Sequence, residues 1–162
     1  MSAAEIAPAA GSAAAIAAAL GVALLIKLAR RTRPQDVLEL SCLLDQLLTV
    51  RGQLLTLAQA DASAIAAWIS TRHLDESDPK RQAALRTMVE VPLEAAELCR
   101  TARCEAQPLL DCGHPPARPD GEVGVQLLDV SQHSLRYLAQ ANVSMLRDPS
   151  LVETMKSRLE AL

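Results

Sequence analysis

The stretch that decides the fold is residues 11–31, which read GSAAAIAAALGVALLIKLARR. Alanine and leucine dominate this stretch, and both are strong helix formers. Ser12 offers a hydroxyl that can bond the free amides of a first helical turn, and Pro34 marks a break soon after Arg31. The sequence therefore predicts a long, alanine-rich helix that begins near Gly11 and Ser12.

This first helix raises the question of a membrane span, because residues 7–26 carry no charged side chain. Twenty such residues are about enough to cross a bilayer, and Arg30, Arg31 and Arg33 could form its positive flank. The many alanines contribute little to insertion, whereas small residues at four-residue spacing let neighbouring helices approach closely. We therefore expect a buried helix and no membrane contact, with a membrane anchor as the alternative.

The remainder of the chain is patterned as helices too. One tryptophan, one tyrosine and no phenylalanine argue against a sheet protein of this size, and Pro92 should kink the helix that contains it. Further helices are expected over about 35–57, 61–73 (or one helix through both), 80–104, 122–146 and a short segment after Pro149. Residues 1–10 are expected to form a loose leader, and the proline-rich residues 112–121 an irregular segment. The expected fold is all-α, with residues 1–162 forming a single domain. It is a bundle of about five to six helices, with a long alanine-rich N-terminal helix and a proline-kinked helix.

Composition narrows the classes of function. The net charge is -3, and no basic stripe interleaves with aromatic residues, so we expect no nucleic-acid partner. The cysteines form no CxxC pair, and a secretory signal is not expected, which favours reduced thiols and a cytoplasmic location. Cys99, Cys104, Cys112 and His114 lie close in sequence, but their spacing is not typical of zinc ligands. We therefore expect no metal.

Five segments follow one another in a recognisable order: PAAGSAAAIAAALGVAL at 8–24, LAQADASAIAAW at 57–68, MVEVPL at 88–93, Gly124-Val125 and Asn142-Val143. Together they resemble the cyclodeaminase/cyclohydrolase family of folate enzymes. The first resembles that family's Pro-Gly-Gly-Gly-Ser helix, the second its Asp-x-x-Ala-Phe segment and the third its kinked Val-Pro-Leu helix. The last two stand where its Gly-Val and Asn-Val elements would fall.

The resemblance implies an all-α protein, usually a homodimer, that binds a tetrahydrofolate derivative as substrate in a cleft near the subunit interface. A methenyltetrahydrofolate cyclohydrolase hydrolyses the methenyl bridge, and a formiminotetrahydrofolate cyclodeaminase closes the ring and expels ammonia. We expect the hydrolase activity, with the deaminase as its near relative. The expected partners are a small pterin, folate or tetrahydromethanopterin, and a second copy of the chain.

The chain also departs from the resembling pattern where a substrate would be held. Ala9 and Ala10 replace two glycines. Gly121-Glu122 stands in place of Ser-Asp, and Leu146 in place of an asparagine. These changes support an alternative, in which the chain has kept the bundle, lost the reaction and serves as a binding or interaction subunit.

Asp61 and Glu122 are the candidate catalytic residues. Both reactions pass through a tetrahedral carbon and need proton transfer in each direction, which a carboxylate can perform. Asp61 lies in an apolar, alanine-rich segment, and its alternative role is a helix N-cap. Glu122 takes the place of the resembling family's aspartate. Its alternative role is a first-turn acid favoured by the helix dipole.

Gly11, Ser12 and Asn142 are the candidate substrate-binding residues. The hydroxyl of Ser12 and the amides near it could hold an anionic or carbonyl group, or the hydroxyl could simply cap its helix. Asn142 lies in an apolar helix, and a buried asparagine must find hydrogen-bond partners. It therefore contacts either a ligand or a neighbouring helix.

Overall fold

The protein is an elongated bundle of helices, seen here in a computed structural model that describes residues 9–162. Most of the leader expected over residues 1–10 lies outside these residues. Within them there is no strand. The helices are α1 (Ala10–Arg31), α2 (Leu40–Thr71), α3 (Pro79–Glu105), α4 (Gln107–Cys112), α5 (Arg118–Val143) and α6 (Pro149–Glu160), with a 3-10 turn, η1, at Pro115–Ala117. The all-α prediction is confirmed.

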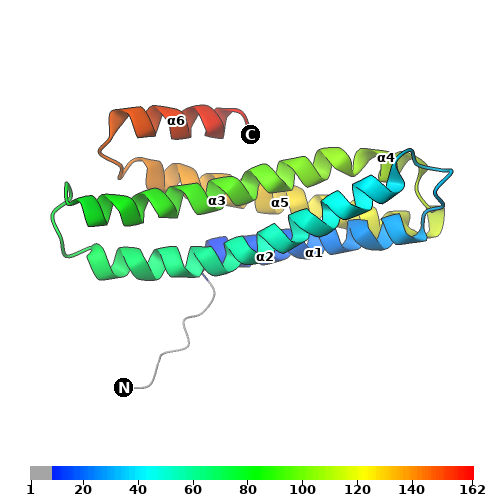
Figure 1. The fold of residues 1–162 in the computed structure, drawn as a ribbon, viewed down its shortest axis with the longest axis horizontal. Coiled ribbons are helices and arrows are strands. Elements are labelled where there is room, and N and C mark those ends of the chain that lie inside the picture. Colours follow the sequence, from blue (N-terminus) through cyan, green and yellow to red (C-terminus); the bar gives the residue numbers. More distant parts are fainter. Residues whose placement is uncertain (1–8) are drawn as a thin grey trace, which may run out of the picture.

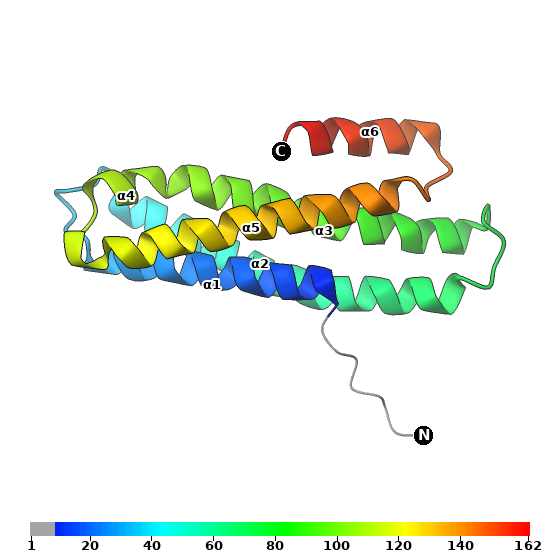
Figure 2. The ribbon, with the colours of Figure 1, turned by 180° about the vertical axis from the view of Figure 1, so that it is seen from behind.

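Four long antiparallel helices, α1, α2, α3 and α5, form the body of the bundle (Figure 1). α1 packs against α2 and α5, and α3 packs against the same two helices. α4 and η1 close the end of the bundle at which α1 finishes, and α6 lies outside the four-helix body (Figure 2). α3 runs without interruption through Pro92 and bends along its length (Figure 1).

α1 is the apolar centre of this arrangement. By length and composition it could cross a membrane, but one whole face of it is packed against other helices. Val22, Leu25 and Leu28 are fully buried in the main core cluster with Leu47 of α2. Each such side chain contributes about 1.5–3 kcal/mol through burial. This packing matches the buried helix that the small side chains predict.

Two helix boundaries differ from the sequence prediction. α2 begins at Leu40, not near residue 35, because the chain first turns to bury Val37, and Glu39 then adopts a left-handed conformation with φ 55°. α5 begins at Arg118, four residues early. Residues 112–121, expected to be irregular, instead start helices, since Pro115 and Pro119 stand in first turns, where a proline's missing N–H leaves no hydrogen bond unmade.

Gly21 of α1 and Gly124 of α5 bring these two helices together. A Cβ added to either glycine would lie 2.7 Å from the carbonyl oxygen of the other. Since both obstacles are backbone atoms, no side-chain rotation could relieve the clash. The two helices therefore touch through their main chains at this level.

Gly124→Ala should lower the free energy of unfolding by about 1–3 kcal/mol, because the added methyl group forces α1 and α5 apart. Gly52, an exposed glycine inside α2, is the matched control, since a Cβ there meets nothing within 4 Å. Gly52→Ala should stabilise the protein by up to about 1 kcal/mol through helix propensity. Urea denaturation measures both, and equal effects of the two substitutions would contradict the close contact.

Candidate functional site

Asp61 is a buried carboxylate in the continuous helix α2, with 8% of its surface exposed. Its Oδ2 accepts two hydrogen bonds from Ser12, one from the backbone N–H at 2.7 Å and one from the hydroxyl at 2.9 Å. The Ser12 amide lies in the first turn of α1, where no carbonyl of the same helix can accept from it. Ala9, the N-cap residue, has no side-chain oxygen. Asp61 therefore caps α1 from a neighbouring helix.

Gly11 allows this contact. A Cβ at position 11 would lie 2.3 Å from Oδ1 of Asp61, far inside contact distance. The carboxylate thus rests directly against the backbone of the first turn of α1. There the positive end of the helix dipole favours a negative charge. Three of the five candidate residues, Gly11, Ser12 and Asp61, therefore meet at one point.

The capping roles considered from sequence for these residues are both wrong. Ser12 is the third residue of α1, not its N-cap, because the helix already begins at Ala10. Asp61 does not begin a separate helix, because α2 continues unbroken from Leu40 to Thr71. The capping interaction exists, but it joins two helices that are 49 residues apart in sequence.

Glu122 lies well away from this point within the chain. Its side chain is exposed, and its neighbours Gly121 and Gly124 face Leu28 and Leu24 near the far end of α1. Leu24 is twelve residues beyond Ser12, a separation of about 18 Å along a helix. Glu122 is not the first-turn acid of α5 either. Asp120 takes that place and forms an ion pair with Lys27 at 2.8 Å.

Asn142 makes a hydrogen bond between helices. Its Nδ2 donates to the backbone carbonyl of Met88 on α3 at 3.0 Å. In an α-helix that carbonyl would accept from the residue four positions later, but that residue is Pro92, which has no N–H. Asn142 therefore satisfies the carbonyl that the proline leaves free. The four-residue spacing of Met88 and Pro92 could have indicated this free carbonyl from the sequence alone.

Leu146, which replaces an asparagine of the resembling family, has become a core residue. It is 7% exposed and belongs to a second cluster that includes Leu85 and Leu159. The apolar side chain is therefore used for packing between the bundle and α6. This position has no polar group to offer a substrate.

An apolar cleft of about 610 Å³ opens between α1 and α5. It opens on the α5 side of α1, and Gly11, Ser12 and Asp61 do not line it. Most of its walls are alanines of α1 and apolar side chains of α5. Its lining residues are Ala10, Ala13, Ala14, Ala17, Val130, Ser131, His133, Ser134, Tyr137 and Leu138. Its volume is within the range of small-molecule sites.

Trp68, the only tryptophan in the chain, lies seven residues beyond Asp61 on α2. Two helical turns separate the two residues, so they share a face of the helix. The indole nitrogen of Trp68 is buried and has no hydrogen-bond partner within residues 9–162. An unpaired buried donor is uncommon, and no sequence signal other than the helical spacing pointed to it.

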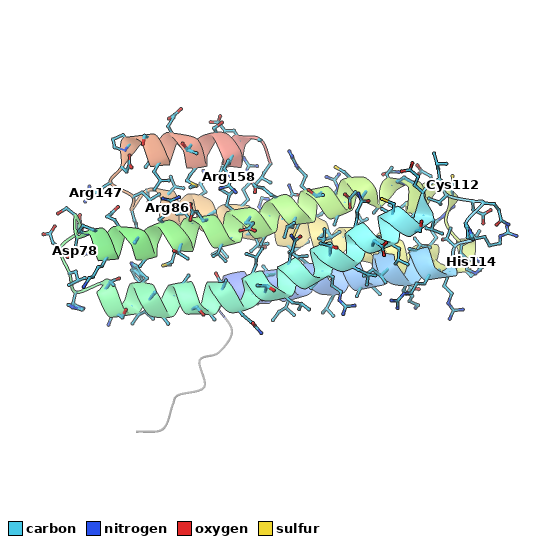
Figure 3. All side chains as sticks on the ribbon, viewed as in Figure 1. Asp78, Arg86, Cys112, His114, Arg147 and Arg158 are labelled. Carbon is cyan, nitrogen blue, oxygen red and sulfur yellow. The ribbon has the colours of Figure 1, made fainter. Side chains whose placement is uncertain are left out.

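The described part of the chain contains no group of three metal-ligating side chains close enough to hold an ion. Cys99 is fully buried, and burial raises the pKa of its thiol to about 12. A thiol with such a pKa does not supply the thiolate that metals bind. Cys112 and His114 lie at the α4 end of the bundle (Figure 3).

The family model for formiminotransferase-cyclodeaminase matches residues 1–161. The chain belongs to this family. The formimidoyltransferase-cyclodeaminase of Rattus norvegicus is 29% identical over 169 residues, and that of Sus scrofa is 28% identical over the same length. Each match covers 96% of this chain but only 31% of the relative. The chain thus spans about a third of the length of these curated relatives.

A solved structure agrees with the fold. The formiminotetrahydrofolate cyclodeaminase of Thermotoga maritima matches with a TM-score of 0.86 and 19% sequence identity, over 95% of this chain and 79% of that one. The helical architecture of the formiminotransferase-cyclodeaminase family is therefore preserved here. The resemblance stated from the sequence segments is confirmed.

For this family member, Asn142→Ala should lower the free energy of unfolding by about 1–3 kcal/mol, since the carbonyl of Met88 loses its donor. Pro92→Ala restores the backbone donor, so the same asparagine substitution should cost less in that background. Urea denaturation of the two single variants and the double variant gives the coupling energy. Strict additivity would contradict the link between Asn142 and Pro92.

Proposed function

We propose that the chain binds a tetrahydrofolate derivative beside Gly11, Ser12 and Asp61 and hydrolyses its methenyl bridge. The observation that carries the proposal is the carboxylate of Asp61, which is buried and held through Oδ2 by Ser12. No hydrogen bond to Oδ1 is formed within residues 9–162. One oxygen is thus fixed in position, and the other remains available to a water molecule or a ligand nitrogen.

The proposed role of Asp61 is proton transfer. In the hydrolysis, water adds to the methenyl carbon, the new C–O bond forms, and the bond from that carbon to N5 breaks to leave the 10-formyl product. Asp61 accepts a proton from the attacking water and returns one to N5 as it departs, and the second water proton passes to solvent. A positioned carboxylate contributes about 10²–10⁴-fold to such a step.

Cyclodeamination is the second candidate reaction, and the names of the relatives favour it. The Thermotoga maritima protein is a cyclodeaminase, and the mammalian relatives carry the word in their names. The same carboxylate could protonate the departing ammonia. The catalytically inactive alternative is supported by Leu146, which is packed in the core, and by Asn142, whose amide is already used by Met88.

We propose that a second copy of the chain covers the outer face of α1 and α5. Large apolar side chains stand exposed there, with Leu20 at 59% and Val130 and Tyr137 at 68% each. Val123 is a third exposed apolar residue of α5. Val123, Val130 and Tyr137 are seven residues apart, which is the repeat that lines the contact between two packed helices. This face supports a homodimer. From the composition of the chain we further propose a cytoplasmic location, with no membrane or nucleic-acid partner.

Purified protein should consume the absorbance of methenyltetrahydrofolate faster than buffer does. Asp61→Asn should slow this by at least about 10²-fold, because the amide cannot accept the water proton. Asp45→Asn, which alters an exposed carboxylate on the same helix, should leave the rate unchanged. Ammonia release from the formimino substrate, measured in parallel, separates the two reactions. If the chain binds folates and accelerates neither reaction, the inactive alternative holds.

Trp68 should report binding, because it is the only tryptophan and shares a helix face with Asp61. We expect its fluorescence to change as a tetrahydrofolate derivative is titrated, in step with a rise in Tm that follows the logarithm of ligand excess. Trp68→Phe should remove the optical signal and keep the Tm shift. A saturable Tm shift with no change in Trp68 emission would place the ligand elsewhere.

A further inference from the structure

α6 packs against both α3 and α5, but its ion pair lies on the α3 side. On that side, Arg158, labelled in Figure 3, forms a two-pronged ion pair with Glu97 of α3, at 2.9 and 2.7 Å. Arg100 of α3 also donates to the carbonyl of Ala161. The opposite side of α6, toward α5, has no ion pair among the described residues. A cleft opens between α5 and α6 above their apolar contact.

This cleft has a volume of about 580 Å³, which is within the range of small-molecule sites. Its apolar surface comes from both helices and includes Val143 and Leu146 from the α5 end and Val152 and Leu159 from α6. Three of these four side chains are also core residues. The floor of the cleft is thus held in place by core packing, and Gln140 and Ser144 add neutral polar groups to the lining.

The lips of the cleft are charged. Arg136 on α5 and Lys156 on α6 both line it, and neither forms an ion pair with any described carboxylate, unlike Lys27, Arg86 or Arg158. Glu160 is the one acidic lining residue. Two cations and one carboxylate leave a net charge of about +1 beside an apolar floor.

We propose that the cleft between α5 and α6 binds a small amphipathic monoanion, a carboxylate or sulfonate with an apolar ring or short acyl body. The apolar body lies on Val143, Leu146 and Val152, and the anionic group lies between Arg136 and Lys156. Charge complementarity and volume support this occupant over a protein helix. The site is separate from Asp61, whose contacts lie with α1, and does not depend on the proposed folate reaction.

The test uses two dyes of nearly the same shape on the full chain. Anilinonaphthalene sulfonate carries the anion, and its uncharged counterpart N-phenylnaphthylamine does not. The cleft variant is Arg136→Gln with Lys156→Gln. The matched control is Arg51→Gln with Lys80→Gln, one arginine and one lysine that are exposed and form no ion pair among the described residues.

We expect the sulfonate dye to bind the wild type at one site and the cleft variant about tenfold more weakly. The control variant should stay within about twofold, and the neutral dye should not distinguish the three proteins. Val152→Asp, which places a charge on the cleft floor, should weaken both dyes. Thermal unfolding confirms that each variant is folded.

Three results would overturn the proposal. The first is that the wild type does not bind the sulfonate dye, or that the cleft and control variants bind it equally. The second is that the neutral dye loses as much affinity as the sulfonate in the cleft variant. The third is that the cleft variant lowers the oligomeric mass in light scattering, because a second copy would then be the occupant.

Discussion

The carboxylate of Asp61 is the constraint on which the N-terminal half of the bundle depends. A buried charge is costly unless it is hydrogen-bonded, and Ser12 supplies both an amide and a hydroxyl to it. The same contact satisfies an amide that α1 cannot satisfy by itself. Because Gly11 has no Cβ, α1 and α2 can come close enough for the contact to form. The contact between Asp61 and Ser12 thus fixes the register of these two helices, caps α1 and depends on their close packing at Gly11.

A second constraint acts at the level of Pro92. The proline interrupts the hydrogen bonding of α3, and the amide of Asn142 repairs it from α5. The side chains of Asp61 and Asn142 thus each serve a backbone group of another helix. Their structural use limits what remains for chemistry, and Oδ1 of Asp61 is the carboxylate oxygen that stays available. This is why the proposed reaction rests on Asp61 and not on Glu122 or Asn142.

Much of the fold was predictable from local patterns. The alanine-rich run of α1, the leucine spacing of α2 and the caps at Asp78 and Asp148 are all determined within a few residues. The start of α5 was not, because Pro115 and Pro119 stand in first helical turns, where a sequence pattern indicates a helix break equally well. A proline looks the same in the sequence whether it breaks a helix or stands in the first turn of one. The packing of the neighbouring helices decides between the two.

The site was predictable in part. The segments that resemble the family placed Gly11, Ser12 and Asp61 among the candidates, and helix packing brings these three together. The distance of Glu122 from Asp61 could not be predicted, because the sequence does not say which part of α5 lies beside which part of α1. The role of Asn142 depended on a carbonyl 54 residues away. Long-range pairs of this kind come from packing, and a single sequence does not display them.

The central claim is that Asp61 both caps α1 and contacts the substrate. A crystal structure of the chain with a bound tetrahydrofolate derivative tests it most directly. We expect a pterin nitrogen or the one-carbon unit within hydrogen-bond distance of Oδ1 of Asp61, while Oδ2 remains bonded to Ser12. A fully occupied folate elsewhere on the protein, with Asp61 contacting only α1, would contradict it.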